Sequence, residues 1–350
     1  MSTNSIIIGT KEISGSSKCY VIAEIGHNHQ GKLETAIKLI EEAALCGVDA
    51  VKFQKRHNKN LYTTAFYNKP YENENSYGVT YGEHREYLEF GENEYRKLKQ
   101  CAEKNNVDFL CTAFDVESVD FLEKIDIPAY KIASGDITNI PLLTYVAKLG
   151  KPIIASTGAS TMEEVKLAYE TVLQYNKQLC LLHCIAEYPA DYSNLNLNII
   201  RTFTENFPEA IVGYSGHDNG ILAPVIAYML GARIIEKHFT LCHAWKGTDH
   251  KFSLEPAGMK KMVRDLERIN VSLGSGEKRI NNYELDARTK MGKSLYIAES
   301  LPRGTVLERK HVSIKTPGTG LPPYKMADII GKTLKTDIEK ESLILPEHIV

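Results

Sequence analysis

The chain has 350 residues, a hydrophobic fraction of 43% and a formal net charge of −2 at pH 7. This near-neutral charge gives no electrostatic reason to expect nucleic acid or an anionic membrane as a partner. No apolar run reaches the about 18 residues that a membrane-spanning helix needs, and the first residues lack the charged and apolar regions of a signal peptide. The length suits one large domain followed by a small one.

The seven cysteines are an odd number, no C-x-x-C occurs, and most of them sit in apolar runs. This usage argues against a disulfide framework. We therefore expect reduced, mostly buried thiols in a cytoplasmic protein.

From Tyr20 onward, short apolar runs alternate with segments of helical periodicity, which predicts strands and helices in turn. The predicted strands cover residues 20–24, 50–54, 108–114, 128–133, 152–157, 179–184, 211–215 and 232–235. The last predicted helix of the series is 256–273. Eight strand–helix units over about 255 residues are typical of an α/β fold of the (β/α)₈ TIM-barrel type. A doubly wound sheet is the alternative, although no Gly-rich phosphate fingerprint follows an early strand.

Three segments lie outside the repeating pattern. The apolar run Ile6–Ile8 suggests a hairpin that covers the bottom of the barrel, and the polar, aromatic stretch Arg56–Phe90 is long enough to be a functional loop. Short β-like runs at 295–298, 305–307 and 312–314, separated by turn signals, predict a small β-rich domain. We expect a catalytic barrel over residues 1–280, a linker over 281–293 and the small domain over 294–350.

Catalytic groups of a barrel come from the C-terminal ends of its strands. The predicted strand ends supply Glu24, Lys52, Gln54, Thr112, Lys131, Ser134, Asp136, Ser156, His183, Ser215, His217, Glu236 and His238, with Tyr188 just beyond the sixth strand. Several are two residues apart on one strand, so their side chains share a face. A single pair of this kind could simply be the end of a strand whose polar side chains are hydrogen-bonded to their neighbours. A whole set converging on one face indicates a site, because burying polar groups without partners is costly.

The residue types indicate what this site could bind. Lys52 and Lys131 are cations, and together with the serine hydroxyls they suit a phosphate. His217 and His238 are only two protein ligands, which leaves positions open for water and substrate oxygens, as a Lewis-acid metal requires. A structural zinc site would need four ligands, including cysteines. Asp249, in the loop after the eighth strand, either reaches the substrate or is a solvated loop carboxylate.

Ordered motifs along nearly the whole chain resemble the N-acetylneuraminate (sialic acid) synthase family. They are A-E-I-G-H-N-H-Q-G at 23–31, V-K-F-Q at 51–54, K-I-A-S-G-D at 131–136, S-T-G at 156–158, H-C-I-A-E-Y-P at 183–189, G-Y-S-G-H at 213–217, E-K-H-F-T-L at 236–241 and G-T-D-H-K-F-S-L-E-P at 247–256. The tail K-T-P-G-T-G-L-P-P at 315–323 is similar to the family's antifreeze-like domain. The loop at 81–90 is similar to the animal-type sialic acid synthases.

The resemblance implies a metal-dependent condensation of phosphoenolpyruvate with N-acetylmannosamine or its 6-phosphate. The products would be N-acetylneuraminate or its 9-phosphate, and inorganic phosphate. The implied cofactor is a divalent metal, Mn²⁺ first, with Mg²⁺ or Co²⁺ as alternatives. The implied assembly is a domain-swapped homodimer in which one subunit's antifreeze-like domain reaches over the other's barrel.

The resemblance also assigns roles to residues. Catalytic roles fall on Glu24, Lys52, Lys131 and Asp136, the last where many members have a glutamate. Phosphoenolpyruvate binding falls on Lys52, Thr112, Lys131, Ser134, Ser156 and Ser215. Sugar contacts fall on Gln54, Tyr188 and Asp249, and metal ligation on His217 and His238.

Two positions depart from the family pattern. Ile185–Ala186 replace a T-[SN] pair of many bacterial members, and Thr316 stands where many carry an arginine that reaches the acetamido group. The acceptor sugar therefore stays open, with a 2,4-diacetamido sugar leading to legionaminic acid as an alternative. A Schiff-base sialic acid aldolase and a sugar-binding protein without turnover are the competing readings.

Overall fold

The computed structural model describes residues 4–350. The chain divides into two compact units, Met1–Leu273 and Gly274–Val350. None of the described helices is both long enough and apolar enough to cross a membrane.

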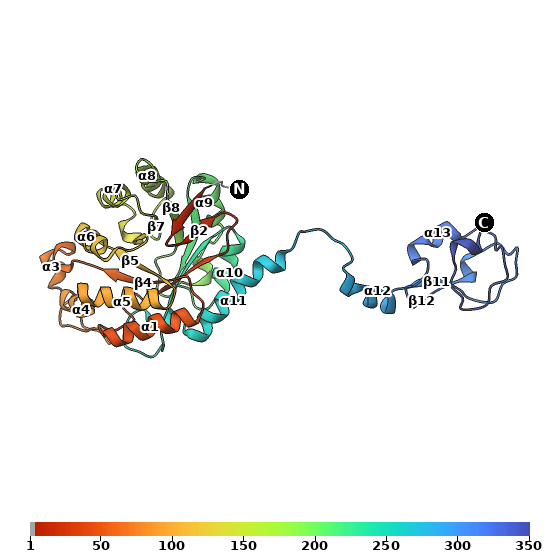
Figure 1. Ribbon diagram of the computed structural model, residues 1–350, viewed down its shortest axis with the longest axis horizontal. Helices are drawn as coiled ribbons and strands as arrows, with labels where there is room; N and C mark the ends of the chain where they lie inside the picture. The colour runs from red at the N-terminus through yellow and green to blue at the C-terminus, as the bar shows by residue number, and fades with distance from the viewer. Residues whose placement is uncertain (1–3) are drawn as a thin grey trace. The chain divides into compact units, whose positions relative to one another are not determined.

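Eight parallel strands of the first unit close into a barrel with helices on its outside (Figure 1). The strands are β3 (Tyr20–Glu24), β4 (Ala50–Lys55), β5 (Asp108–Ala113), β6 (Tyr130–Ile132), β7 (Ile153–Ser156), β8 (Leu179–Cys184), β9 (Ile211–Gly216) and β10 (Ile234–His238). The barrel closes where β10 pairs with β3, which sets His238 beside Glu24. The predicted (β/α)₈ barrel is confirmed, and the doubly wound alternative is wrong.

The helices that follow the strands pack around the barrel. They are α1 (Leu33–Leu45), α5 (Glu92–Lys104), α6 (Val116–Ile125), α7 (Ile140–Lys148), α8 (Met162–Leu173), α9 (Ile199–Asn206), α10 (Leu222–Met229) and α11 (Pro256–Leu273). The long connection after β4 contains three further short helices, α2 (Asn58–Leu61), α3 (Thr64–Tyr67) and α4 (Tyr81–Leu88). The segment expected as a functional loop is thus partly helical.

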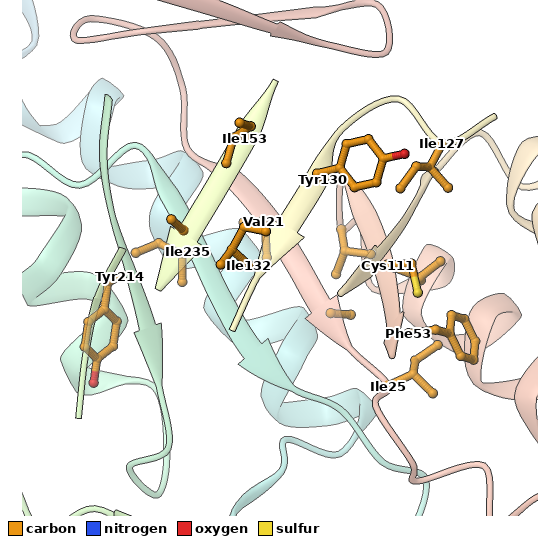
Figure 2. Packing of buried hydrophobic residues seen from close by; sticks show 14 of the residues in the cluster. Val21, Ile25, Phe53, Cys111, Ile127, Tyr130, Ile132, Ile153, Tyr214 and Ile235 are labelled. Carbon is orange, nitrogen blue, oxygen red and sulfur yellow. The ribbon is translucent and has the colours of Figure 1, made fainter. Parts of the chain in front are cut away.

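Apolar side chains form two separate layers of core. Outward-facing strand residues pack under the helices, as Figure 2 shows for Phe53, Tyr130 and Ile235. Inward-facing residues from the lower part of the strands, such as Ile22 and Ile154, form a second cluster inside the barrel. Since successive strand residues face opposite sides, both faces of each strand are buried, as expected of a parallel sheet.

A hairpin closes the N-terminal end of the barrel, as the sequence suggested. Strands β1 (Ser5–Ile8) and β2 (Lys11–Ser14) pair antiparallel. Ile6, Ile8 and Ile13 of this hairpin are buried in the inner cluster. With the lower barrel filled by apolar side chains, only the opposite, C-terminal end is left to hold polar groups.

The second unit has its own small core of buried apolar side chains, among them Leu295, Leu307 and Ile344. Strands β11 (Ser294–Ile297) and β12 (Val312–Lys315) form a two-stranded antiparallel sheet. The run 305–307, expected as a strand, contributes only an isolated bridge between Val306 and Thr333. The short helix α12 (Leu285–Met291) lies within residues 281–293, the range expected as a linker, and α13 (Met326–Ile329) follows later in this unit.

Candidate active site

Successive side chains of each strand point alternately out of and into the barrel. The outward ones pack under the helices, and the inward ones near the C-terminal end line the barrel mouth. On β10, Ile234 belongs to the inner apolar cluster, while Ile235 packs outward under the helices. Glu236 and His238 share the inward face of Ile234 and line a cavity of about 290 Å³ at the C-terminal end. The strand runs to His238, three residues beyond the predicted end at Ile235, so these polar side chains belong to the barrel itself.

This cavity collects most of the predicted site residues. Those among its lining are Glu24, Lys52, Gln54, Thr112, Lys131, Ser134, Ser156, Tyr188, Ser215, His217, Glu236, His238 and Asp249. They come from strands across the whole barrel, so the expected convergence on one mouth is a feature of the structure.

Two expected positions are not part of the lining. Asp136 lies in a 3₁₀ turn after β6, and its Oδ1 accepts a hydrogen bond of 3.2 Å from Asn139. His183 faces outward, where its Nε2 lies 2.7 Å from the carbonyl oxygen of Leu195. The next residue, Cys184, lines the cavity instead. Because neighbouring strand residues face opposite sides, assigning His183 to the mouth was wrong by one position.

The two lysines of the site meet at one carboxylate oxygen. Oε1 of Glu236 lies 3.6 Å from Nζ of Lys52 and 3.9 Å from Nζ of Lys131, and it accepts a hydrogen bond of 3.1 Å from Ser215. Lys131 also donates to Oγ of Ser156 at 2.6 Å. Two ammonium groups from the non-adjacent strands β4 and β6 are thereby brought together beside serine hydroxyls, an arrangement that suits a phosphate.

Lys52 is held from its other side by Glu24. Its Nζ lies 2.6 Å from Oε2 of Glu24 and donates to Thr112 at 2.9 Å. Gln54 donates to the second oxygen of Glu24 at 2.6 Å. All four side chains project into the same cavity, so Glu24 is tied to the lysine and to Gln54 at once.

The pKa values of these carboxyl and ammonium groups are shifted mainly by burial and by the charges of their neighbours. Burial alone would raise the pKa of Glu236, but the ammonium groups of Lys131 and Lys52 lower it to about 2, so this carboxylate is ionised. Burial raises the pKa of Glu24 despite the attraction of Lys52. Burial lowers the pKa of Lys131. The raised pKa makes Glu24 the carboxyl group best suited to hold a proton beside a bound anion.

The two histidines form a pair at the same mouth. The ring centroids of His217 and His238 lie 5.4 Å apart. Nδ1 of His217 lies 2.9 Å from the carbonyl oxygen of Ile185, which requires the proton on Nδ1 and leaves Nε2 with a free lone pair. Nδ1 of His238 is buried without a hydrogen-bond partner, and Oδ2 of Asp249 lies 3.7 Å from it.

Both imidazoles are neutral near pH 7. Burial first, and then the neighbouring His238, lower the pKa of His217 to about 4. Burial lowers the pKa of His238 to about 4 as well, against the attraction of Asp249. Neutral imidazole is the form that binds metal ions, and a carbonyl acceptor on the second nitrogen is the usual support of a metal-binding histidine. The donor set therefore fits a divalent ion.

Residues 4–350 contain no group of three or more His, Cys, Asp and Glu side chains arranged to hold a metal. An ion at the histidine pair would therefore take several ligands from water or substrate, as an open catalytic site requires.

Several lining residues were not in the expected set, among them His27, Arg56 and Arg85. A signal for Arg56 exists in the sequence, because it continues the two-residue spacing of Lys52 and Gln54. For Arg85 the sequence indicated only that residues 56–90 form a functional loop, and helix α4 of that connection carries the side chain to the cavity.

The fold and the site define a TIM-barrel protein with a cradle for anions and an imidazole pair at one mouth. Residues 39–278 match the NeuB family, and residues 292–350 match the SAF domain, which is the antifreeze-like domain. The chain therefore belongs to the NeuB family. This confirms the resemblance to sialic acid synthases.

Named relatives cover nearly the whole chain. The N-acetylneuraminate-9-phosphate synthase of Homo sapiens is 36% identical over 96% of this chain and 94% of its own length. The N,N'-diacetyllegionaminic acid synthase of Legionella pneumophila is 36% identical over 100% of this chain and 99% of its own. A crystal structure of the sialic acid synthetase from Leptospira borgpetersenii, in complex with citrate, has a TM-score of 0.70 and 33% identity over 81% of this chain and 95% of that one. The protein is thus an enzyme of the sialic acid synthase type.

Proposed function

We propose that the protein condenses phosphoenolpyruvate with N-acetylmannosamine, or its 6-phosphate, to give N-acetylneuraminate, or its 9-phosphate, and inorganic phosphate. The observation that carries the proposal is the convergence of Lys52 and Lys131 on Glu236, in the cavity that also holds the His217–His238 pair. The name of the human relative supports the same reaction.

In this reaction C3 of phosphoenolpyruvate forms a bond to the aldehyde carbon of the open-chain sugar. Water adds to C2, and the C2–O bond to the phosphate breaks. One proton of the water ends on the new hydroxyl group and the other on the released phosphate. Lys52 and Lys131, with Ser156 and Ser215, hold the phosphate before and after it leaves. Glu24, whose pKa is raised by burial, stores a proton 2.6 Å from Lys52.

His217 and His238 would hold a divalent ion, which we propose is Mn²⁺, with Mg²⁺ or Co²⁺ as alternatives. When bound, such an ion polarises a carbonyl group and activates water as a Lewis acid. Gln54, Tyr188 and Asp249 line the same cavity, and we assign them to the sugar, whose orientation against the enol lowers the entropic barrier. Asp136 lies outside the lining and receives no substrate contact in this scheme.

A 2,4-diacetamido sugar is the second candidate acceptor. It is favoured by the legionaminic acid synthase of Legionella pneumophila, which is as similar to this chain as the human protein is. From the family resemblance we further propose a cytoplasmic enzyme and a domain-swapped homodimer.

A substrate panel tests the proposal. The purified protein is assayed with Mn²⁺ and phosphoenolpyruvate plus N-acetylmannosamine, its 6-phosphate, or a 2,4-diacetamido hexose, and both phosphate and 2-keto acid are measured. We expect one of the first two sugars to stimulate both products. Preference for the diacetamido sugar would show that this sugar, and not N-acetylmannosamine, is the acceptor. In a separate experiment, covalent trapping of pyruvate on a lysine by borohydride would favour the Schiff-base aldolase.

A further inference from the structure

Two arginines line the cavity beyond the lysine cradle. Arg56 directly follows β4, four residues after Lys52, and an extended chain rises about 3.3 Å per residue, which places its Cα about 13 Å further out. Arg85 comes from α4, whose first turn is fixed by a capping box between Thr80 and Glu83. Both guanidinium groups border the same cavity as the proposed sugar contact Gln54.

Neither arginine has a carboxylate partner. Among residues 4–350, no carboxylate oxygen lies within the 4.0 Å of an ion pair from either guanidinium group. Arg56 donates to Oε1 of Gln54 at 2.7 Å, and Arg85 donates twice to the hydroxyl of Tyr81, at 3.0 and 2.9 Å. The other polar contact of each is with the ring of His27, whose Nε2 lies 3.2 Å from Arg56 and whose Nδ1 lies 3.1 Å from Arg85. The guanidinium group of Arg56 also lies over the ring of Phe114, 3.6 Å from its centroid.

The ring of His27 cannot satisfy both arginines. A neutral imidazole has one N–H and one lone pair, and a guanidinium group only donates. One arginine therefore faces an N–H group instead of an acceptor. Protonating the ring would remove the remaining acceptor, and the pKa of His27 is lowered well below its ordinary value by burial and then by both arginines.

The positive charges of Arg56 and Arg85 therefore have no carboxylate of the described residues at ion-pair distance within the cavity. Arg56 is only 7% exposed, and burial first, then the charge of Arg85, lower its pKa. Glu89 and Asp249 attract Arg56 and Arg85 respectively, but from beyond ion-pair distance. Arg85 is partly buried, and Tyr81, Tyr62 and Asp249 raise its pKa against the effect of burial. A buried cation without a close anion, such as Arg56, is costly, and guanidinium groups match the geometry of a phosphate.

We propose that Arg56 and Arg85 bind the phosphate on C6 of the acceptor, so that the acceptor class is a 2-acetamido-hexose 6-phosphate. The inference rests on the proposed function, which places the aldehyde end of the sugar at the lysines and histidines. Gln54 connects the two regions, since it hydrogen-bonds both Glu24 and Arg56. The sugar phosphate takes no part in the bond changes. It remains in the product, and the released phosphate comes from phosphoenolpyruvate alone.

The test compares two acceptors in five proteins. Wild type, Arg56→Gln, Arg85→Gln, Arg85→Lys and the control Arg96→Gln are assayed with N-acetylmannosamine and with its 6-phosphate, at saturating phosphoenolpyruvate and Mn²⁺. Arg96 is an exposed residue of α5 paired with Glu92. We expect wild type to prefer the 6-phosphate at least about tenfold in kcat/KM, and each glutamine variant to lose about 10- to 100-fold on the 6-phosphate, the range for charged hydrogen bonds.

Arg85→Gln, whose side chain bonds only Tyr81 and His27, should change kcat/KM for unphosphorylated N-acetylmannosamine less than about threefold, since the contact it loses to substrate is the charge-assisted one to the phosphate. Arg56→Gln also loses its hydrogen bond to Gln54, so for this variant we expect a loss on both sugars that is larger on the 6-phosphate. Arg85→Lys, which keeps the charge, should retain part of the preference, and Arg96→Gln should change nothing. Circular dichroism checks that each variant is folded.

Three results would overturn the inference while leaving the proposed condensation intact. They are equal use of both acceptors by wild type, equal losses on both acceptors in the glutamine variants, or glutamine variants that raise the KM for phosphoenolpyruvate instead of lowering kcat/KM for the 6-phosphate, measured by varying phosphoenolpyruvate at a fixed sugar concentration. If neither sugar is turned over, the proposed function fails separately. Calorimetric titration with N-acetylmannosamine 6-phosphate then decides the inference, since binding that is weaker in Arg85→Gln supports it and binding that is equal or absent contradicts it.

Discussion

The rings of His217, which directly follows β9, and His238, the last residue of β10, have centroids 5.4 Å apart at the mouth of the barrel. His217 is oriented by the carbonyl group of Ile185, and His238 keeps a buried nitrogen without a hydrogen-bond partner. The two imidazoles do not hydrogen-bond each other, so each keeps a nitrogen that can bind a metal ion.

We predict that His217→Ala and His238→Ala each weaken Mn²⁺ binding at least about tenfold, because losing one of only two protein ligands costs more than the 10- to 100-fold of an outer-shell change. Binding to metal-free protein is measured by electron paramagnetic resonance. His183→Gln is the matched control, since His183 faces away from the cavity. Unchanged binding in either alanine variant would contradict the assignment.

The buried contact between Lys52 and Glu24, at 2.6 Å, gives a stability prediction. Lys52→Met leaves a buried carboxyl group without its cation, so we expect the free energy of unfolding to fall by about 3 kcal/mol. The double variant Lys52→Met/Glu24→Gln should recover part of this loss, because it removes a buried carboxyl group that would otherwise have to stay unpaired or bind a proton. Urea unfolding is measured for Lys52→Met, for Glu24→Gln and for the double variant. A double variant whose loss equals the sum of the two single losses would argue against coupling.

The hairpin below the barrel offers a matched pair of isoleucines. Ile8 is fully buried in the inner cluster, whereas Ile7, next to it on β1, is 56% exposed. Ile8→Ala should lower the free energy of unfolding by about 2–5 kcal/mol through the cavity it creates. Ile7→Ala should change it by less than about 0.5 kcal/mol. Comparable unfolding midpoints for the two variants would show that the hairpin does not contribute to the core.

A second buried ion pair supports the segment that carries His217. Nζ of Lys237 lies 3.2 Å from Oδ1 of Asp218, and both side chains are fully buried. The hydroxyl of Tyr214 donates to the same oxygen at 2.8 Å. Asp218→Ala leaves a buried ammonium group without its anion and should cost about 3–5 kcal/mol.

Tyr214→Phe removes one hydrogen bond of the same group and should cost about 1 kcal/mol. The loss of stability in the two variants is compared by thermal unfolding in the absence of Mn²⁺. A larger loss in Tyr214→Phe than in Asp218→Ala would contradict this ranking.

The sequence was sufficient to predict the barrel, because alternating strand and helix signals repeat over the whole first unit and each strand ends in polar residues. It also predicted which polar residues share the cavity, since position at a strand end and two-residue alternation decide that. His183 was misplaced because a shift of one residue reverses the face of a strand. Asp136, in the turn after β6, is not part of the cavity lining, so its catalytic role stays a prediction.

Arg85 was missed for a different reason. It reaches the cavity only through the fold of the long connection between β4 and β5, and tertiary placement of that kind leaves no periodic signal. The same holds for the contact of both arginines with His27, which is visible only once the three segments are brought together.

The most direct test of the central claim is a stoichiometry measurement with metal control. The protein is stripped of metal with a chelator, incubated with phosphoenolpyruvate and N-acetylmannosamine or its 6-phosphate, and then supplied with Mn²⁺. We predict no turnover before the addition and, after it, one inorganic phosphate released for each nine-carbon 2-keto acid formed. Phosphate release that is independent of the sugar, or absent with both sugars and Mn²⁺, would contradict the assignment of Lys52, Lys131, His217 and His238 to this condensation.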